Sequence, residues 1–304
     1  MKKITIATRE SALALWQAHF VRDRLMEAHP GLDVKLLGMT TKGDQWLNAP
    51  LKEIGGKGLF IKELEVAMLE GRADLAVHSV KDLPAFLPEG FSLPFIGFRE
   101  DVRDVLLGCP GGIDQLPKNA KIGSSSPRRQ AQLLAHRPDL RIESIRGNVQ
   151  TRLSKLDSGE FDAIVLAQAG LSRLSIDRDD AYPLALEDCL PAPGQGALGI
   201  EILSNSPVEA LLEKLLNKDV ARCVEAERGI SAGLGADCAL PVAAYATADA
   251  KSEIHLQALV AQPDGRAILR AEGRGSDPKA LAQRVVTELL DQGAQSILDS
   301  ARRS

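Results

Sequence analysis

The sequence predicts an α/β protein with two lobes, followed by a smaller α+β domain with a three-stranded sheet. Two observations carry this prediction. Short apolar segments typical of strands alternate with segments of helical periodicity as far as Ile202, and beyond Pro207 the pattern changes to helices followed by three strands. With 304 residues and 44% hydrophobic content, the chain can form the cores of two or three domains.

The first lobe begins with a strand and a helix. Residues 3–8 alternate between apolar and polar side chains, which predicts a strand, and Ser11 can cap a helix whose apolar residues keep helical spacing (Leu13, Trp16, Phe20, Val21 and Leu25). Glycines within 55–58 precede a second helix, and residues 74–78 predict a short strand that ends in the polar loop 79–84. Open α/β sheets bind ligands at such strand ends, so this loop is a candidate site.

The second lobe and the C-terminal domain follow from the same patterns. The second lobe is predicted to contain strands near 120–123, at 140–145 and at 162–167, with helices from Pro127 and over 148–157. Residues 189–196 are interpreted as a crossing segment, after which 197–202 forms a strand that returns to the first lobe. The last domain is predicted to have helices at 207–217 and 219–233, strands at 239–248, 253–261 and 266–273, a turn at 262–265 and a final helix opened by Asp277-Pro278.

Composition excludes several classes of function. The net charge of −4 argues against general affinity for nucleic acid or acidic membranes. The lysines at the N-terminus are not followed by an apolar stretch long enough for a secretion signal, and no membrane-spanning run occurs later, so a cytoplasmic protein is predicted. The four cysteines lack CxxC spacing and the five histidines form no HxxH or HExxH pair, so neither a disulfide framework nor a metal site is predicted.

Two neighbouring segments, 123–130 and 145–152, place four arginines and three serines at the starts of two predicted helices. Ser126 is expected to be an N-cap and Pro127 the first helical residue, so free backbone N–H groups lie beside Arg128 and Arg129. The planar guanidinium of arginine binds a carboxylate or phosphate with two hydrogen bonds. The pattern indicates a site for a small anion, with a solvated basic helix start as the alternative.

Six segments in the same order resemble porphobilinogen deaminase, a family also called hydroxymethylbilane synthase. They are ATRESALALWQA at 7–18, GGKGLFIKELE at 55–65, DLAVHSVKDLP at 74–84, IGSSSPRRQ at 122–130, IRGNVQTRL at 145–153 and LPAPGQGALGIE at 190–201. The resemblance implies a monomeric, cytoplasmic enzyme of tetrapyrrole biosynthesis whose first two lobes are similar to type II solute-binding proteins. The three domains it implies are 1–96 with 196–215, 97–195 and 216–304.

The resemblance also implies a covalent cofactor. In this family a dipyrromethane, made from two substrate units, is held by a thioether to one cysteine, and Cys238 matches that position. Ala236-Asp237 stand where the family more often has two glycines, Val242 where it has Ile, and Pro127 where Leu is common. Without the resemblance, a small buried hydrophobe would be the expected role of Cys238, as it is for Cys109, Cys189 and Cys223.

The reaction implied by the family joins four porphobilinogen units head to tail. Ammonia leaves each unit to give a cationic azafulvene, which the free α-carbon of the growing chain attacks, and water finally releases hydroxymethylbilane. Asp82 matches the catalytic aspartate, whose carboxylate can stabilise the cation and move protons. A turn aspartate before Leu83-Pro84 is the alternative for this residue.

Each pyrrole ring carries two carboxylates, so a cationic site is required to hold the growing chain. The matching positions imply cofactor contacts from Ser79, Lys81, Ser125, Ser126, Arg128, Arg129, Arg146 and Gly147. They imply substrate contacts from Arg9, Ser11, Gln17, Lys57, Arg152, Arg173 and Gln195. For Lys57 and Arg173 a solvated surface position is an alternative. The glycine-containing segment 43–58 is a candidate lid, and His78 is expected to be a packed or hydrogen-bonded residue at a strand end.

Two other functions stay open at this point. A two-lobed protein could bind or sense an organic anion without turnover, although the absence of an export signal and the third domain with Cys238 argue against it. A phosphate-ester enzyme could use the serines and arginines at the helix start. The sequence has neither a P-loop lysine signature nor a metal-ligand cluster to support that activity.

Overall fold

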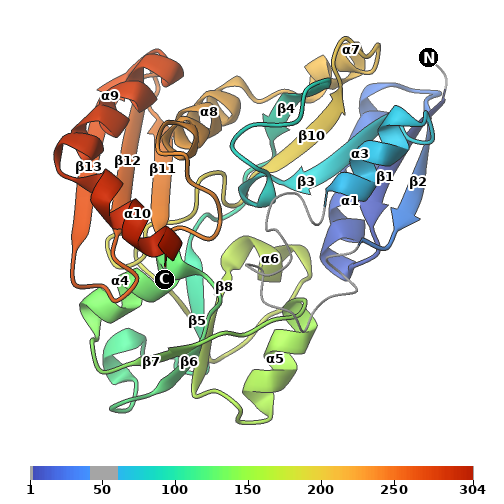
Figure 1. Ribbon diagram of the computed structural model, residues 1–304. Coiled ribbons are helices and arrows are strands. Elements are labelled where there is room, and N and C mark those ends of the chain that lie inside the picture. Colours follow the sequence, from blue (N-terminus) through green and yellow to red (C-terminus); the bar gives the residue numbers. More distant parts are fainter. Residues whose placement is uncertain (1–2, 42–60, 304) are drawn as a thin grey trace. The chain divides into compact units, whose positions relative to one another are not determined.

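The computed structural model describes residues 3–41 and 61–303. These residues form two compact units, one from Met1–Arg99 with Ala197–Ala221 and the other from Glu100–Gly196 with Arg222–Ser304. Figure 1 shows the helices and strands of both units, coloured along the chain. Among the described residues, no helix has the length and apolar character that crossing a membrane requires.

The first unit is built on a five-stranded mixed sheet in the order β2-β1-β3-β10-β4. Strand β1 (Lys3–Arg9) pairs in parallel with β2 (Asp33–Met39) and β3 (Leu75–Ser79), whereas β10 (Leu198–Leu203) runs antiparallel to β3 and to β4 (Phe91–Gly97). The predicted return of 197–202 to the first lobe is therefore confirmed. Strands β2 and β4 were not predicted from the sequence.

The helices of this unit bury one apolar face against the sheet. Helix α1 (Ala12–Ala28) begins at the predicted N-cap, where Ser11 accepts a hydrogen bond from the backbone N–H of Ala14, and it packs Val21 and Leu25 into the core beside Ile4 and Ile6. Helix α3 (Lys62–Leu69) packs Leu64, Ala67 and Met68. The predicted helix over 207–217 consists of two short pieces, α7 (Glu209–Leu212) and η3 (Glu213–Leu215).

The second unit contains another five-stranded mixed sheet, in the order β7-β6-β8-β5-β9. Strand β6 (Lys121–Gly123) pairs in parallel with β7 (Arg141–Glu143) and β8 (Ala163–Ala167), and β5 (Asp104–Leu107) is antiparallel to β8 and β9 (Ala181–Pro183). Its helices are η2 (Ile113–Gln115), α4 (Pro127–His136), α5 (Val149–Asp157) and α6 (Gln168–Arg173). The sequence predicted α4 and α5 but not β5, β9 or α6.

The same unit carries the predicted three-stranded antiparallel sheet, β11 (Val242–Ala248), β12 (Ile254–Ala261) and β13 (Ile268–Gly275), in that order. Helices α8 (Lys218–Gly233), α9 (Pro278–Asp291) and α10 (Ala294–Arg303) share a core with this sheet. The helix predicted to begin at Asp277-Pro278 forms as α9, but it is not the final one, because Gly293, with φ of 97°, separates it from α10.

A close backbone contact joins the β12–β13 hairpin to α4. The predicted turn at 262–265 forms, with the N–H of Gly265 donating to the carbonyl of Gln262 at 2.9 Å. A Cβ at Gly265 would lie 2.5 Å from the backbone nitrogen of Ala135 and 2.6 Å from the carbonyl oxygen of Ala131. Only a residue without a side chain fits between the hairpin and the helix.

We predict that Gly265→Ala destabilises the protein more than Gly159→Ala. The two glycines have nearly the same φ, 74° and 75°, but a Cβ at Gly159 meets no atom within 4 Å. Gly159→Ala should therefore cost about 1–2 kcal/mol for the left-handed backbone alone. Gly265→Ala should lose a further ~1–3 kcal/mol, because the methyl group meets backbone that cannot rotate away.

Urea unfolding followed by far-UV circular dichroism measures the difference between the two variants. Equal losses in the free energy of unfolding would show that the hairpin and α4 can move apart without cost, which would contradict a close contact between them.

Candidate functional site

In the first unit, the candidate residues gather around the end of β3. Ser79 ends the strand and accepts a hydrogen bond at 2.8 Å from the side-chain amide of Gln17, which is 3% exposed. The next residues form a 3-10 turn, η1 (Val80–Asp82), in which Lys81 is half-buried and Asp82 is exposed. The structure thus places the carboxylate of Asp82 on a turn at the C-terminal end of a buried strand, as the sequence predicted for this loop.

The turn is held in place by apolar packing and two backbone hydrogen bonds. The N–H of Val80 donates to the carbonyl of Ala197 at 3.1 Å, and the N–H of Leu83 donates to the carbonyl of Val80 at 3.1 Å. Val80 is 1% exposed, and its Cγ2 lies 3.0 Å from the position that a Cβ on Gly199 would occupy. The missing side chain at Gly199 lets β10 approach the turn closely.

A buried hydrogen-bonded pair lies at the same strand end. Nε2 of His78 is 2.9 Å from Oε2 of Glu201, and both side chains are buried. The expectation that His78 is a hydrogen-bonded residue at a strand end is confirmed. Nearby, burial and the Glu201 carboxylate raise the pKa of Glu65.

Arg9 and Ser11 belong to the same unit. Arg9 ends β1 and is half-buried, and Ser11 uses its hydroxyl to cap α1. Lys57 and the candidate lid at 43–58 lie outside the described residues.

In the second unit, the start of α4 has the predicted geometry. Ser126 is the N-cap and its Oγ accepts from the N–H of Arg129 at 3.5 Å, with Pro127 as the first helical residue. Arg128 and Arg129, however, are only 4% and 6% exposed. The alternative of a solvated basic helix start is therefore wrong for these two arginines.

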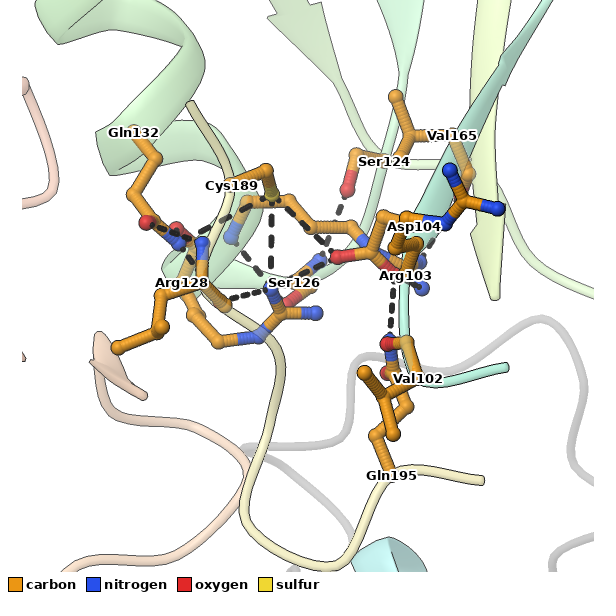
Figure 2. A network of polar contacts seen from close by, with 12 residues as sticks. Val102, Arg103, Asp104, Ser124, Ser126, Arg128, Gln132, Val165, Cys189 and Gln195 are labelled. Atoms are coloured by element: carbon orange, nitrogen blue, oxygen red, sulfur yellow. Dashed lines mark hydrogen bonds and ion pairs between the residues drawn. The ribbon is translucent and has the colours of Figure 1, made fainter. Parts of the chain in front are cut away.

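Both arginines pair with one buried carboxylate, that of Asp104 (Figure 2). Nη1 of Arg128 is 2.8 Å from Oδ2, and Nη2 of Arg129 is 2.7 Å from Oδ1. Nη1 of Arg129 also donates to the carbonyl of Val165 at 2.9 Å, and Nη1 of Arg128 donates to the carbonyl of Leu190 at 2.8 Å. Among the described residues, Nε of Arg129 is buried without a hydrogen-bond partner.

The electrostatics of this cluster follow from its burial. Burial alone would raise the pKa of Asp104, but the charges of Arg128 and Arg129 outweigh it and hold that pKa below its usual range. Burial, with the adjacent Asp104 carboxylate, raises the pKa of the Cys189 thiol to about 12. Cys189 therefore stays protonated at neutral pH and donates to Oδ2 of Asp104 at 3.3 Å.

A second cationic group lies where α5 begins. Arg146 and Arg152 are half-buried, and Nε of Arg152 donates to the carbonyl of Gly147 at 2.9 Å. Gly147 has a φ of 108°, and a Cβ there would lie 2.6 Å from Cγ2 of Thr151, so a glycine is required. Ser125 donates to the carbonyl of Ile145 at 2.6 Å, which ties this loop to the segment before α4.

The predicted crossing segment, 189–196, is held by side chains from several elements. The amide of Gln195 donates to the carbonyl of Val102 at 2.7 Å and to Oδ1 of Asp104 at 2.9 Å, and this residue is fully buried. Nη2 of Arg173 donates to the carbonyl of Gly196 at 2.6 Å. Glu227 on α8 accepts from the N–H groups of Gly194 and Ala246 at 2.7 and 2.8 Å.

Burial distinguishes Arg173 from a surface cation. Its side chain is 4% exposed, and burial lowers the pKa of its guanidinium to about 10. The solvated surface position considered for Arg173 is therefore wrong.

Cys238 lies in the loop between α8 and β11 and is exposed, whereas Cys189 and Cys223 are buried and Cys109 is half-buried. The residues before it explain how the loop forms without two glycines. Ala236 packs into the core of the small domain, and Oδ1 of Asp237 accepts from the N–H of Ala239 at 3.0 Å. The backbone at both positions lies outside the left-handed region, so side chains are accommodated.

Three members of the Asp104 cluster were not predicted from the sequence as site residues: Asp104, Gln132 and Cys189. Gln132 lies one helical turn after Arg128, and its amide joins α4 to the backbone of Leu190 at 3.0 and 2.8 Å. The sequence did contain a signal for a buried carboxylate, since two arginines beside an apolar helix face need a counter-charge. Among the described residues, no group of His, Cys, Asp or Glu could hold a metal ion.

Comparison with known proteins gives relatives for the whole chain. Residues 4–210 match the family model described as porphobilinogen deaminase, dipyromethane cofactor binding domain, and residues 221–291 match the model of the porphobilinogen deaminase C-terminal domain. A protein of Thiobacillus denitrificans named porphobilinogen deaminase is 52% identical over 304 residues, which cover 99% of each chain.

Two of the solved structures that match are distant in sequence. The periplasmic VFT2 domain of BvgS from Bordetella pertussis is 15% identical, with a TM-score of 0.41 over 70% of this chain and 86% of that one. The BenM effector binding domain with benzoate is 16% identical, with a TM-score of 0.42 over 70% and 90%. These scores are too low to support an argument about function.

The six segments found in the sequence all lie within the residues that the first family model matches, and the full-length relative covers almost the whole chain. The chain belongs to the porphobilinogen deaminase family.

Proposed function

We propose that the chain joins four porphobilinogen units head to tail, with loss of ammonia, onto a dipyrromethane attached to Cys238, and releases hydroxymethylbilane by hydrolysis. The family membership supports the reaction and the cofactor. The observation that carries the assignment of the attachment site is the exposure of Cys238, which alone among the four cysteines is exposed. A thioether can form only where the sulfur can meet the incoming group.

The described residues fit a cofactor that carries several carboxylates. The start of α4 offers two buried guanidinium groups, and Nε of Arg129 has no acceptor among the described residues. A carboxylate of the ligand supplies such an acceptor, and a charge-assisted hydrogen bond removes the cost of the unpaired N–H. When bound, the dipyrromethane supplies the terminal pyrrole to which substrate units are added.

The remaining proposed contacts fall into two groups, those to the cofactor and those to the substrate. In the proposal, Ser79, Lys81, Ser125, Ser126, Arg146 and Gly147 hold the cofactor together with the arginine pair, and Arg9, Ser11, Gln17, Lys57 and Arg152 hold substrate carboxylates. Arg173 is buried against segment 189–196, and Gln195 is a buried residue of that segment. Their burial supports a role in shaping that segment for the substrate rather than a solvent-facing contact.

Asp82 is the proposed catalytic residue. Loss of ammonia leaves positive charge spread over the pyrrole ring, and a fixed carboxylate lowers the energy of that charge. The exposed carboxylate of Asp82 lies on a turn fixed by Val80, so it needs little reorganisation to act. The carboxylate oxygens of Asp82 can also accept hydrogen bonds from pyrrole N–H groups, and they can move a proton to or from the reacting carbon.

The organisation of the whole protein is also part of the proposal. We assign three domains, 1–96 with 196–215, 97–195 and 216–304, in a cytoplasmic monomer that does not bind nucleic acid. The three separate sheets support this division. An organic-anion binder without turnover is not favoured, because the family match extends through the C-terminal domain.

Cys238→Ser should fold but carry no added mass. The wild-type protein should show an intact mass above that of the chain by two deaminated substrate units, because the thiolate of Cys238 is the attachment point. Electrospray mass spectrometry of the purified full chain measures this excess directly.

Cys109→Ser is the matched control, since Cys109 is half-buried and donates to the carbonyl of Gly112 at 3.4 Å. The Cys109→Ser variant should keep both the added mass of the cofactor and the activity. Retention of the adduct in Cys238→Ser would overturn the attachment site, and an unmodified wild-type chain would favour the binder without turnover.

Replacing Asp82 by Asn and by Glu separates charge from shape. If the carboxylate stabilises a cation that exists only along the reaction path, Asp82→Asn should lose most of kcat with little change in substrate affinity. Asp82→Glu should retain more activity, because it keeps the charge and displaces it by one methylene.

A turn aspartate would give the opposite order, since Asn is an equally good turn former and Glu is not. Turnover is measured on variants whose cofactor content has been verified by mass. Higher turnover in Asp82→Asn than in Asp82→Glu would contradict the electrostatic role.

A further inference from the structure

The proposed reaction gives no role to Asp104, although its carboxylate is the centre of the buried polar network drawn in Figure 2. Asp104 is the first residue of β5 and is 0% exposed. Four donors surround it. Oδ1 accepts from Nη2 of Arg129 and from the amide of Gln195, and Oδ2 is paired with Nη1 of Arg128 and accepts from the thiol of Cys189.

This arrangement uses the hydrogen-bonding capacity of the carboxylate completely. An ionised carboxylate has about four acceptor positions, and each oxygen of Asp104 already has two donors. Asp104 therefore has no free acceptor for a substrate N–H and cannot serve as a proton carrier. What it can do is fix the orientation of the groups that point at it.

The charges in the cluster are not balanced. Two guanidinium groups face one carboxylate, while Gln195 is neutral and the Cys189 thiol stays protonated. One positive charge is left over in a buried place, and Nε of Arg129 has no acceptor among the described residues. A ligand anion would correct both deficits, so the cluster has the excess charge and the unpaired donor that anion binding requires.

We propose that Asp104 is a positioning residue that holds Arg128 and Arg129 in the orientation in which they receive the carboxylates of the dipyrromethane. Through Gln195 it also fixes the arginine pair to segment 189–196. This inference rests on the proposed function, because it requires the arginine pair to bind the cofactor.

The inference predicts a specific defect in cofactor loading. Asp104→Asn keeps the size of the side chain but replaces one acceptor oxygen by an NH2 donor. In either orientation of the amide, this donor faces a guanidinium and a second donor, which is the amide of Gln195 or the thiol of Cys189. At least one arginine should leave its orientation. When the apo fraction of the full chain is incubated with porphobilinogen and followed by intact mass, the rate of loading should fall by at least tenfold.

The control is Asp139→Asn, which breaks an arginine–aspartate pair at the other end of the same helix. Arg137 is the C-cap of α4, and its Nε and Nη2 lie 2.7 and 2.9 Å from the carboxylate oxygens of Asp139. At a temperature where both variants are folded by circular dichroism, Asp139→Asn should load at the wild-type rate. A general loss of stability would slow both variants, whereas a positioning role slows only Asp104→Asn.

A milder pair of variants tests the inference if Asp104→Asn does not fold. Cys189→Ala removes one donor to Oδ2 and leaves both ion pairs, and Cys189→Ser restores a hydroxyl donor at the same place. Loading should slow by roughly twofold to fivefold in the alanine variant and recover in the serine variant. Wild-type loading by Cys189→Ala would contradict the positioning role in that case.

Arg129→Met distinguishes a failure of this inference from a failure of the proposed function. If Arg129→Met loads at the wild-type rate, the arginine pair does not hold the cofactor, and both the proposed contacts and this inference are wrong. If it does not load while a folded Asp104→Asn loads at the wild-type rate, the contacts stand and the positioning role of Asp104 is wrong.

Discussion

The pairing of two buried arginines with one buried carboxylate constrains the rest of the second unit. Taking a guanidinium out of water costs several kcal/mol unless it is paired and hydrogen-bonded, so Arg128 and Arg129 can enter the interior only where Asp104 meets them. The requirement fixes β5 against the start of α4, because Asp104 is the first residue of that strand and the arginines are in the first turn of that helix. The helix start therefore presents its cationic groups from a rigid frame rather than on flexible surface side chains.

Segment 189–196 is hydrogen-bonded both to this cluster and to the small domain that contains β11 and α8. Its backbone at Leu190 accepts from Arg128, and Gln195 donates to Asp104. The carbonyl of Pro191 accepts from the N–H of Ala244 on β11 at 3.2 Å, and Gly194 donates to Glu227 on α8. The domain that contains Cys238 and the helix that contains the arginines thus share one stretch of backbone. The Gly265 hairpin, packed on the backbone of α4, is a second connection between them.

Local pattern was sufficient for some elements and insufficient for others, and length alone does not separate them, since the seven-residue strands β2 and β4 were also missed. Helix α1 and strands β1 and β12 have apolar residues at regular spacing, which sequence periodicity detects directly, and β3 is a short apolar run. Strands β5 and β9 have four and three residues, and they exist because β8 offers an edge for β5 and β5 offers one for β9. The site shows the same limit. In Asp101-Val102-Arg103-Asp104 the charged residues look equivalent in sequence, yet Asp101 pairs with Arg103 at the surface and Asp104 is completely buried. Only the tertiary fold separates them, whereas the roles of Cys238 and Asp82 came from the resemblance to a family.

Asp82 and Asp104 illustrate how environment assigns different work to one residue type. The oxygens of Asp104 are each occupied by two donors, and its charge is neutralised by two arginines, so it has nothing left to offer a reacting ring. Asp82 is exposed on a short turn, and the backbone hydrogen bonds of Val80 fix that turn. Stabilising a transient cation requires a carboxylate that is held in place yet keeps open acceptor positions. Of the two aspartates, the exposed Asp82 fits these conditions, which supports the role proposed for it, and the saturation of Asp104 explains why a second carboxylate does not compete for the same proposed chemistry.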